Sequence, residues 1–101
     1  MEYVIVVDEA CTIRLIFAGR LTFSDHVHMA QLVRKVVHGP LTRVVIDVSS
    51  LEFIDSVGIG MLMVLAEEVY KFGGRLTTEN QRGQVARVLT TVQFDKFLKF
   101  L

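Results

Sequence analysis

Residues 44–48 constrain the fold of this chain most strongly. Four of these five residues are β-branched, and the single polar residue, Asp47, does not produce the alternation of apolar and polar positions that marks a half-exposed strand. A strand of this composition is covered on both of its faces. We therefore expect residues 44–48 to form a central strand of a sheet that other elements cover.

Short apolar runs and helical patterns alternate along the rest of the chain. Residues 3–7 and 12–18 are β-branched and aromatic runs with a short connection between them, which predicts an N-terminal hairpin. Ser24 can cap a helix whose first turn contains Asp25, and the His-Gly-Pro sequence at residues 38–40 supplies three signals that end it. The first half of the chain therefore predicts a hairpin followed by a helix.

The second half of the chain continues this alternation. The elements expected there are a loop over residues 49–55, a helix from about Ser56 to Phe72 closed by Gly73 and Gly74, a strand at 75–78, and a third helix around Val85, Val88, Leu89 and Val92. Strands and helices that alternate in this way form a mixed or parallel sheet with helices packed on it. A length of 101 residues suits one domain, so we expect residues 1–101 to fold as a single unit.

The composition argues against several classes of function. Lys and Arg number 11, Asp and Glu number 11, and the formal net charge of +0 creates no global field that would draw the protein onto nucleic acid. The longest strongly apolar stretch, residues 59–66, is much shorter than the roughly 20 residues that a membrane span requires. No basic and apolar leader follows Met1. We expect a cytoplasmic protein that binds no nucleic acid and does not insert into membranes.

The stretch most informative about function is residues 47–60, which ends a buried strand and delivers a serine to the start of a helix. Ligands and partners of α/β sheets gather at such junctions. Considered from the sequence alone, Ser56 most simply caps the helix by accepting a hydrogen bond from an unpaired backbone N–H group.

At these residues the sequence resembles the STAS family, which includes the anti-sigma-factor antagonists of bacteria. The resemblance rests on Asp47, the Phe-Ile-Asp-Ser run at 53–56, and Gly58, and it extends over most of the chain through residues 19–21, 73–76 and 85–94. It implies an α/β fold, with a mixed β-sheet of about four to five strands and helices packed mainly on one face.

The resemblance also implies a function that depends on Ser56. A partner kinase that is also an anti-sigma factor would phosphorylate this serine, and a metal-dependent serine phosphatase would reverse the modification. The unmodified protein would bind the anti-sigma factor, while the protein itself would be no enzyme and would need no cofactor. A phosphate beside Asp55 adds enough negative charge to disrupt an interface docked there. Weak self-association is left open.

Helical geometry adds a candidate docking surface. At 100° per residue, one face of the second helix suits packing against the sheet and contains Ile59, Leu62, Met63, Ala66, Val69 and Tyr70. Val57, Met61 and Val64 face away from it and lie near Ser56, so we expect them to contact a partner unless another part of the chain covers them. The predicted partner-binding residues are Asp55, Ser56, Val57, Gly58, Gly60, Met61 and Val64, together with Thr22 and Asp25.

Other kinds of site have little support in the sequence. His26 and His28 are two residues apart and point to different sides of a helix, so a shared metal ion is not expected. Ile54 occupies the place of the first glycine in the Gly-x-Ser-x-Gly motif of serine hydrolases. Asp47, at the end of a strand, is more typical of a hydrogen-bond acceptor that organises a loop than of a catalytic base.

Two departures from the family pattern leave the partner open. Many members carry an acidic residue soon after the Gly-x-Leu turn, where this chain has Thr22 and, slightly later, Asp25. Members usually also continue past their last strand into another helix, which we expect either to be missing from this chain or to lie beyond Leu101. Two alternative functions therefore stay open, namely a module that binds a small ligand such as a nucleotide, or a structural subunit of a sensory or lipid-transport assembly.

Overall fold

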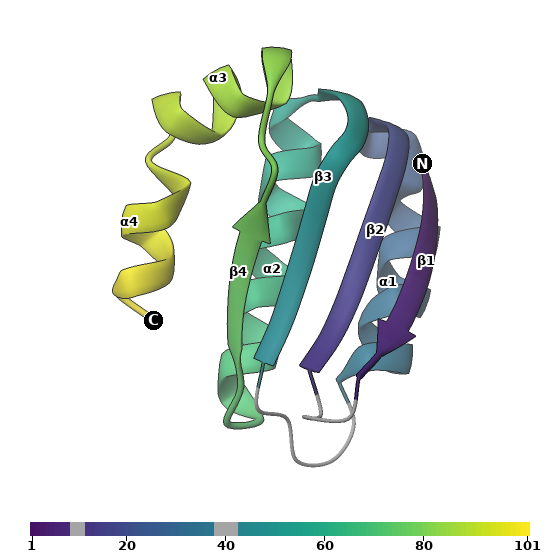
Figure 1. The fold of residues 1–101 in the computed structure, drawn as a ribbon, viewed down its shortest axis with the longest axis vertical. Coiled ribbons are helices and arrows are strands. Elements are labelled where there is room, and N and C mark those ends of the chain that lie inside the picture. Colours follow the sequence, from purple (N-terminus) through teal and green to yellow (C-terminus); the bar gives the residue numbers. More distant parts are fainter. Residues whose placement is uncertain (9–11, 38–42) are drawn as a thin grey trace.

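The computed structural model describes residues 1–8, 12–37 and 43–101, which form an α/β fold around one four-stranded sheet (Figure 1). The strands are β1 (Glu2–Val7), β2 (Thr12–Leu21), β3 (Arg43–Ile54) and β4 (Arg75–Glu79), in the spatial order β1-β2-β3-β4. β1 and β2 are antiparallel, whereas β2, β3 and β4 are mutually parallel. The mixed sheet and the central position of β3 confirm the predictions from the sequence.

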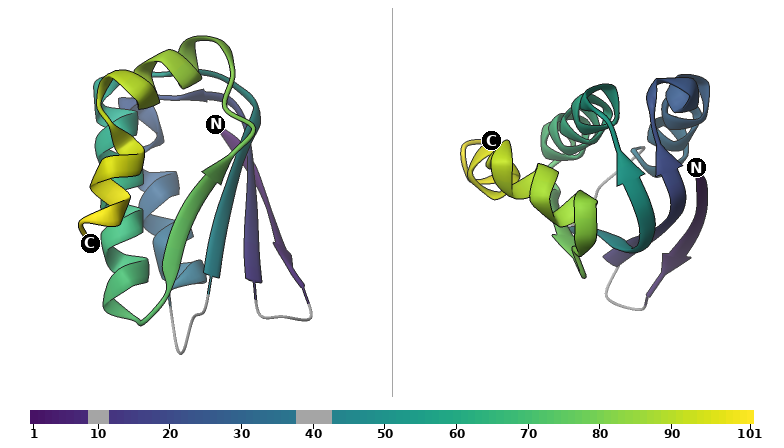
Figure 2. Two further views of the ribbon diagram at one scale, coloured as in Figure 1. Left: turned by 60° about the vertical axis from the view of Figure 1, so that its left-hand side comes forward. Right: turned by 90° about the horizontal axis from the view of Figure 1, so that it is seen from above.

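The helices are a 3-10 turn η1 (Phe23–Asp25), α1 (His26–Val36), α2 (Ser56–Lys71), α3 (Gly83–Thr91) and α4 (Phe94–Lys99). α1 and α2 cover the same face of the sheet (Figure 2). The reason is topological: α1 connects β2 to β3, α2 connects β3 to β4, and the strand order advances in one direction. Right-handed crossovers then place both helices on one side, as the family resemblance implied.

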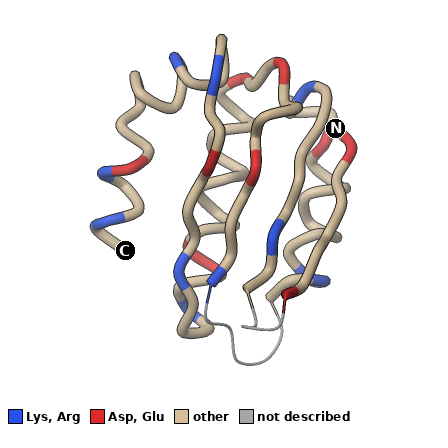
Figure 3. The backbone as a smooth tube through the Cα atoms, viewed as in Figure 1, with Lys and Arg blue, Asp and Glu red and all other residues tan. Residues whose placement is uncertain are grey.

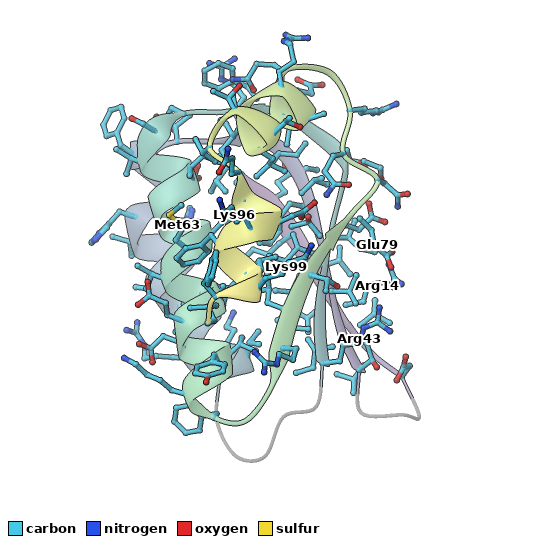
Figure 4. The ribbon with its side chains drawn as sticks, turned by 90° about the vertical axis from the view of Figure 1, so that its left-hand side faces the viewer. Arg14, Arg43, Met63, Glu79, Lys96 and Lys99 are labelled. Atoms are coloured by element: carbon cyan, nitrogen blue, oxygen red, sulfur yellow. The ribbon has the colours of Figure 1, made fainter. Side chains whose placement is uncertain are left out.

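β3 is buried on both faces by two different means. Val44, Ile46 and Val48 face α1 and α2 and belong to the main core. On the opposite face Arg14 of β2 lies in register beside Val45 and reaches across β3 to Glu79 of β4, with 2.8 Å between Nη1 and Oε2. Figure 4 shows these side chains on the face of the sheet that carries no helix. The ion pair therefore covers Val45, which is fully buried.

The expected loop at residues 49–55 is wrong, because β3 continues as a strand to Ile54. The pairing with β2 shifts register twice, from Ile16↔Asp47 to Ala18↔Ser50 and then between Gly19 and Arg20. Such bulges insert extra residues into one strand without ending it. Asp47 accepts a hydrogen bond from the Ser49 amide at 2.9 Å and thus stabilises the first irregularity.

The first helix begins differently from the prediction. Thr22, not Ser24, precedes the helical turn, and its amide donates to Asp25 Oδ2 at 2.9 Å. Ser24 lies inside η1, where its hydroxyl contacts the Thr22 hydroxyl at 2.8 Å. The predicted stop signals at residues 38–40 lie outside the described residues.

α2 presents nearly the predicted face to the sheet. Its buried apolar residues are Ile59, Leu62, Leu65, Ala66 and Val69. Tyr70 was expected in this set but is exposed, and the Arg75 guanidinium lies 5.0 Å from the centre of its ring. The buried stripe is rotated toward Leu65, since α2 packs against both the sheet and α1.

The C-terminal segment forms a helix where we expected the last helix to be missing or to lie beyond Leu101. Residues 94–99 form α4, in which Phe94 is buried and Phe97 stacks on it with 6.0 Å between ring centroids. In the part of the chain that the structure describes, no helix is both long and apolar enough to cross a membrane.

Acid should reveal the structural contribution of Asp47. The Ser49 amide donates to this carboxylate and holds its pKa below the ordinary value, outweighing the opposing effect of partial burial. A group whose pKa is lowered by folding contributes stability above its unfolded pKa and loses it as pH falls through the folded pKa. We expect Asp47→Asn to reduce stability at neutral pH and to flatten the loss of stability below about pH 4.

Urea unfolding of both proteins across the acid range tests this expectation. Glu52→Gln serves as the control, because Glu52 is an exposed carboxylate on the same strand. Parallel pH profiles for Asp47→Asn and the unmodified chain would contradict the assignment.

Candidate functional site

The candidate site lies where β3 ends and α2 begins, and Asp55 holds it together. Asp55 is the N-cap of α2, and its Oδ1 accepts a hydrogen bond from the Gly58 amide at 2.7 Å. Its Oδ2 accepts the Phe23 amide at 3.3 Å, while its own amide donates to Leu21 O at 3.2 Å. One residue therefore fixes the start of α2 to the end of β2 and to η1.

Ser56 is the first residue of α2 and is exposed. Because Asp55 occupies the cap position, the interpretation of Ser56 as the cap is wrong. Within the described ranges its hydroxyl has no hydrogen-bond partner. A phosphate at this position would meet the unpaired amides and the positive end of the α2 dipole, which favour an anion.

The two glycines of the first turns of α2 have different roles. Gly58 is buried, and a Cβ atom placed on it would lie 2.4 Å from Leu21 O and 2.8 Å from Ile54 Cγ1. Gly58, one of the predicted partner-binding residues, is therefore buried and lets α2 approach the ends of β2 and β3. A Cβ atom placed on Gly60 would instead point into open space, with no neighbouring segment within 4 Å, and Gly60 faces a groove.

An apolar groove of about 400 Å³ runs between α1 and α2. Val57, Gly60, Met61 and Val64 line it from α2, opposite His26, Met29, Ala30 and Val33 of α1. Val57 and Val64 are 45% and 53% exposed, whereas Met61 is half-buried against the core. The predicted docking residues Val57, Met61 and Val64 therefore do lie along one groove, although Met61 is less exposed to solvent than expected.

The α1 side of this groove was not predicted from the sequence. Met29, Ala30 and Val33 have helical spacing, but only the relation between α1 and α2 shows that they face Val57 and Val64. The charged residues of both helices lie in their C-terminal halves, away from Ser56 (Figure 3). The groove beside Ser56 is therefore mainly apolar, and among the described residues that line it only His26 is titratable.

Thr22 and Asp25 do not form the surface that the sequence suggested. Asp25 is buried, and its carboxylate accepts hydrogen bonds from the Met1 ammonium at 2.8 Å and the Thr22 amide at 2.9 Å. Burial opposes ionisation, but these hydrogen bonds outweigh it and lower the pKa of Asp25. Asp25 thus organises the start of η1 and is not available to a partner, while Thr22 is half-buried beside it.

Two further residues near the junction were missed by sequence analysis. Phe23 is 69% exposed, although its amide is bonded to Asp55. Gln84, at the start of α3, accepts a hydrogen bond from the Ile54 amide at 3.0 Å and donates one to Ile54 O at 2.9 Å. Neither role has a local sequence signal, because both depend on contacts between distant segments.

No metal site is evident in residues 1–8, 12–37 and 43–101, where no three His, Cys, Asp or Glu side chains converge. His28 Nδ1 lies 3.9 Å from Asp25 Oδ1, while His26 is at the rim of the groove.

The contrast between the two glycines yields a stability test. Gly58→Ala should destabilise the protein by more than about 1 kcal/mol, because the new methyl group collides with backbone that must shift. Gly60→Ala should be neutral or stabilising by up to about 1 kcal/mol, since alanine is favoured in a helix interior and the space is open. Thermal unfolding of both variants measures the difference. Equal stability of the two would contradict the close approach at Gly58.

Comparison with solved structures places the fold among known ones. The structure of the anti-sigma factor antagonist SpoIIAA in its unphosphorylated form has a TM-score of 0.72 and 18% identity, covering 92% of this chain and 83% of that chain. An anti-sigma factor antagonist from Mycobacterium paratuberculosis has a TM-score of 0.75 and 23% identity, covering 94% and 80%. A sulfate transporter family protein from Wolinella succinogenes has a TM-score of 0.75 and 17% identity, covering 92% and 75%.

At these identities the solved structures show a common fold. Comparison with curated protein sequences gives no match. The family model described as "Mlab, STAS domain", however, matches residues 6–100, which include every strand except the start of β1 and the whole Asp55–Ser56 junction. The resemblance drawn from the sequence is confirmed, and the chain belongs to the STAS domain family.

Proposed function

We propose that this protein is a phosphorylation-controlled anti-sigma-factor antagonist, which binds a kinase-type anti-sigma factor in the cytoplasm when Ser56 is unmodified. The observation that carries the proposal is the exposed Ser56 hydroxyl, which is not used in capping and adjoins the apolar groove between α1 and α2. The likeness in fold to two anti-sigma factor antagonists supports it.

In this proposal the chemistry belongs to the partners. The kinase transfers the γ-phosphoryl group of a nucleoside triphosphate to Ser56 Oγ, and the nucleoside diphosphate and the hydroxyl proton are released. The metal-dependent serine phosphatase hydrolyses the phosphoester and restores the hydroxyl. This chain contributes the substrate serine and the surface that both partners recognise, and it catalyses neither step.

The phosphate would act on the surface without unfolding the domain. It adds about −1.5 to −2 charges at neutral pH, next to the Asp55 carboxylate and the apolar lining of the groove. The start of α2 tolerates that charge, since it is held by the Asp55 cap and its dipole favours anions. A partner that buries Val57 or Val64 must then desolvate the phosphate, which opposes binding.

The groove favours a protein partner over a nucleotide. Neither Lys nor Arg, which would pair with a nucleotide phosphate, occurs among the described residues that line it. An amphipathic helix laid between α1 and α2 would bury the exposed valines and keep its polar face in water.

Ser56→Ala tests the site of modification. We expect the cognate kinase to add one phosphate to the unmodified chain and none to the variant, as measured by intact mass. Because Asp55 is the cap, the stability of Ser56→Ala should stay within about 0.5 kcal/mol of the original, the range for a surface substitution. Phosphorylation that persists in Ser56→Ala would refute the assignment.

Ser56→Asp should weaken binding to the anti-sigma factor while circular dichroism stays unchanged.

Separate substitutions on two faces of α2 test the docking surface. Val64→Asp should weaken partner binding with little change in melting temperature, because the side chain is 53% exposed in the free protein. Leu62→Ala should instead reduce stability by about 2–5 kcal/mol, since Leu62 is fully buried and leaves a cavity. Calorimetric titration and thermal unfolding of both variants separate the effects. Normal binding by Val64→Asp would exclude the groove as the docking site.

A further inference from the structure

β1 is an edge strand whose side chains are apolar and unusually exposed. It pairs with β2 in continuous register from Glu2 to Val7, with no bulge. Val4 is 56% exposed and Val7 64% exposed, and Ile5 and Val6 are also exposed. Among the described residues no strand pairs with the opposite edge of β1, so its backbone N–H and C=O groups form a template for another strand.

The other edge of the sheet is protected in ways that β1 lacks. β4 carries Arg75, Thr77 and Glu79 on one face, and α4 lies beside it, forming a pocket lined by residues of both elements. Figure 1 shows α4 next to β4, and among the elements that the structure describes none lies beyond β1 at the opposite side of the sheet. Charges and a covering helix are the usual means by which proteins prevent edge pairing. Residues 3–7 contain no charge and no proline.

We propose that β1 pairs antiparallel with β1 of a second copy of this chain, so that two four-stranded sheets join into one. A twofold axis perpendicular to the sheet generates this arrangement, because it keeps the helix-covered faces on the same side. A second copy is the occupant that suits this edge. It supplies an equally apolar strand, and the net charge of +0 adds no repulsion between copies.

The alternation of side chains determines which residues meet. Val4 and Val6 lie on the helix-free face, in register with Ile16 and Arg14 of β2. In antiparallel pairing, side chains directly opposite one another share a face. Val4 of one copy therefore meets Val4 or Val6 of its partner, and both valines lose contact with water. The dimer does not depend on the function proposed for Ser56, since the edge of β1 is separate from the groove.

Light scattering coupled to size exclusion tests the dimer over a dilution series of the full chain. We expect the unmodified protein to approach twice the monomer mass at high concentration. The double variant Val4→Glu/Val6→Glu should stay monomeric, because identical charges face one another across the twofold axis and Glu2 adds to the repulsion. Val64→Glu, which places a charge on α2, is the matched control and should dimerise normally.

A complementary variant distinguishes this pairing from other modes of association. Native mass spectrometry of a mixture of Val4→Glu/Val6→Glu and Val4→Lys/Val6→Lys should reveal a heterodimer, since opposite charges now meet across β1. Circular dichroism checks that both variants fold. A monomeric unmodified protein at all concentrations would overturn the proposal. So would a dimer that survives in the Glu variant, or two folded variants that form no heterodimer.

Discussion

Burial of β3 on both faces is the constraint on which the rest of the structure depends. The strand pairs with β2 and β4, packs against α1 and α2, and carries Asp55 and Ser56 at its end. Only one face is covered by helices; the Arg14–Glu79 ion pair crosses the other. An exposed ion pair contributes little through its charges alone, but its aliphatic stems exclude water from Val45. β3 can therefore carry apolar residues on both faces at Val44, Val45 and Ile46, although one face of the sheet carries no helix.

The sequence was most informative where local pattern and tertiary environment agree. Residues 44–48 indicated a buried central strand, and the apolar spacing of α2 placed Leu62 and Ala66 in the core, as the structure confirms. It failed at Ser49 and Ser50, which have the composition of a loop but lie in a strand. Pairing with β2 keeps them in the strand, and a local pattern cannot reveal a partner so distant in the chain. The Asp47 carboxylate, two residues before Ser49, adds a local hydrogen bond.

The candidate site illustrates the same limit at the level of single atoms. Asp and Ser are both favourable N-cap residues, so the sequence Asp55-Ser56 does not indicate which of them caps the helix. The packing of Gly58 against Leu21 and Ile54 sets the first turn, and in that setting Asp55 reaches the Gly58 amide. To predict the groove, one must also know how α1 and α2 lie relative to each other. The motif at Asp55–Ser56 and the helical periodicity predicted the α2 side of the groove, whereas the α1 side is evident only in the fold.

The hydrogen bonds between Gln84 and Ile54 have a consequence for dynamics. β4 pairs with β3 only as far as Asp47, so the far end of β3 would leave peptide groups open on that side. The Gln84 amide binds both polar groups of Ile54, as a neighbouring strand would. The Ile54 N–H then exchanges with solvent only when α3 detaches, because the Gln84 side chain leaves with the helix and its hydrogen bond to the Ile54 N–H is broken. Deuterium uptake at Ile54, two residues before Ser56, thus reports the opening of a helix whose Gln84 lies 30 residues later in the chain.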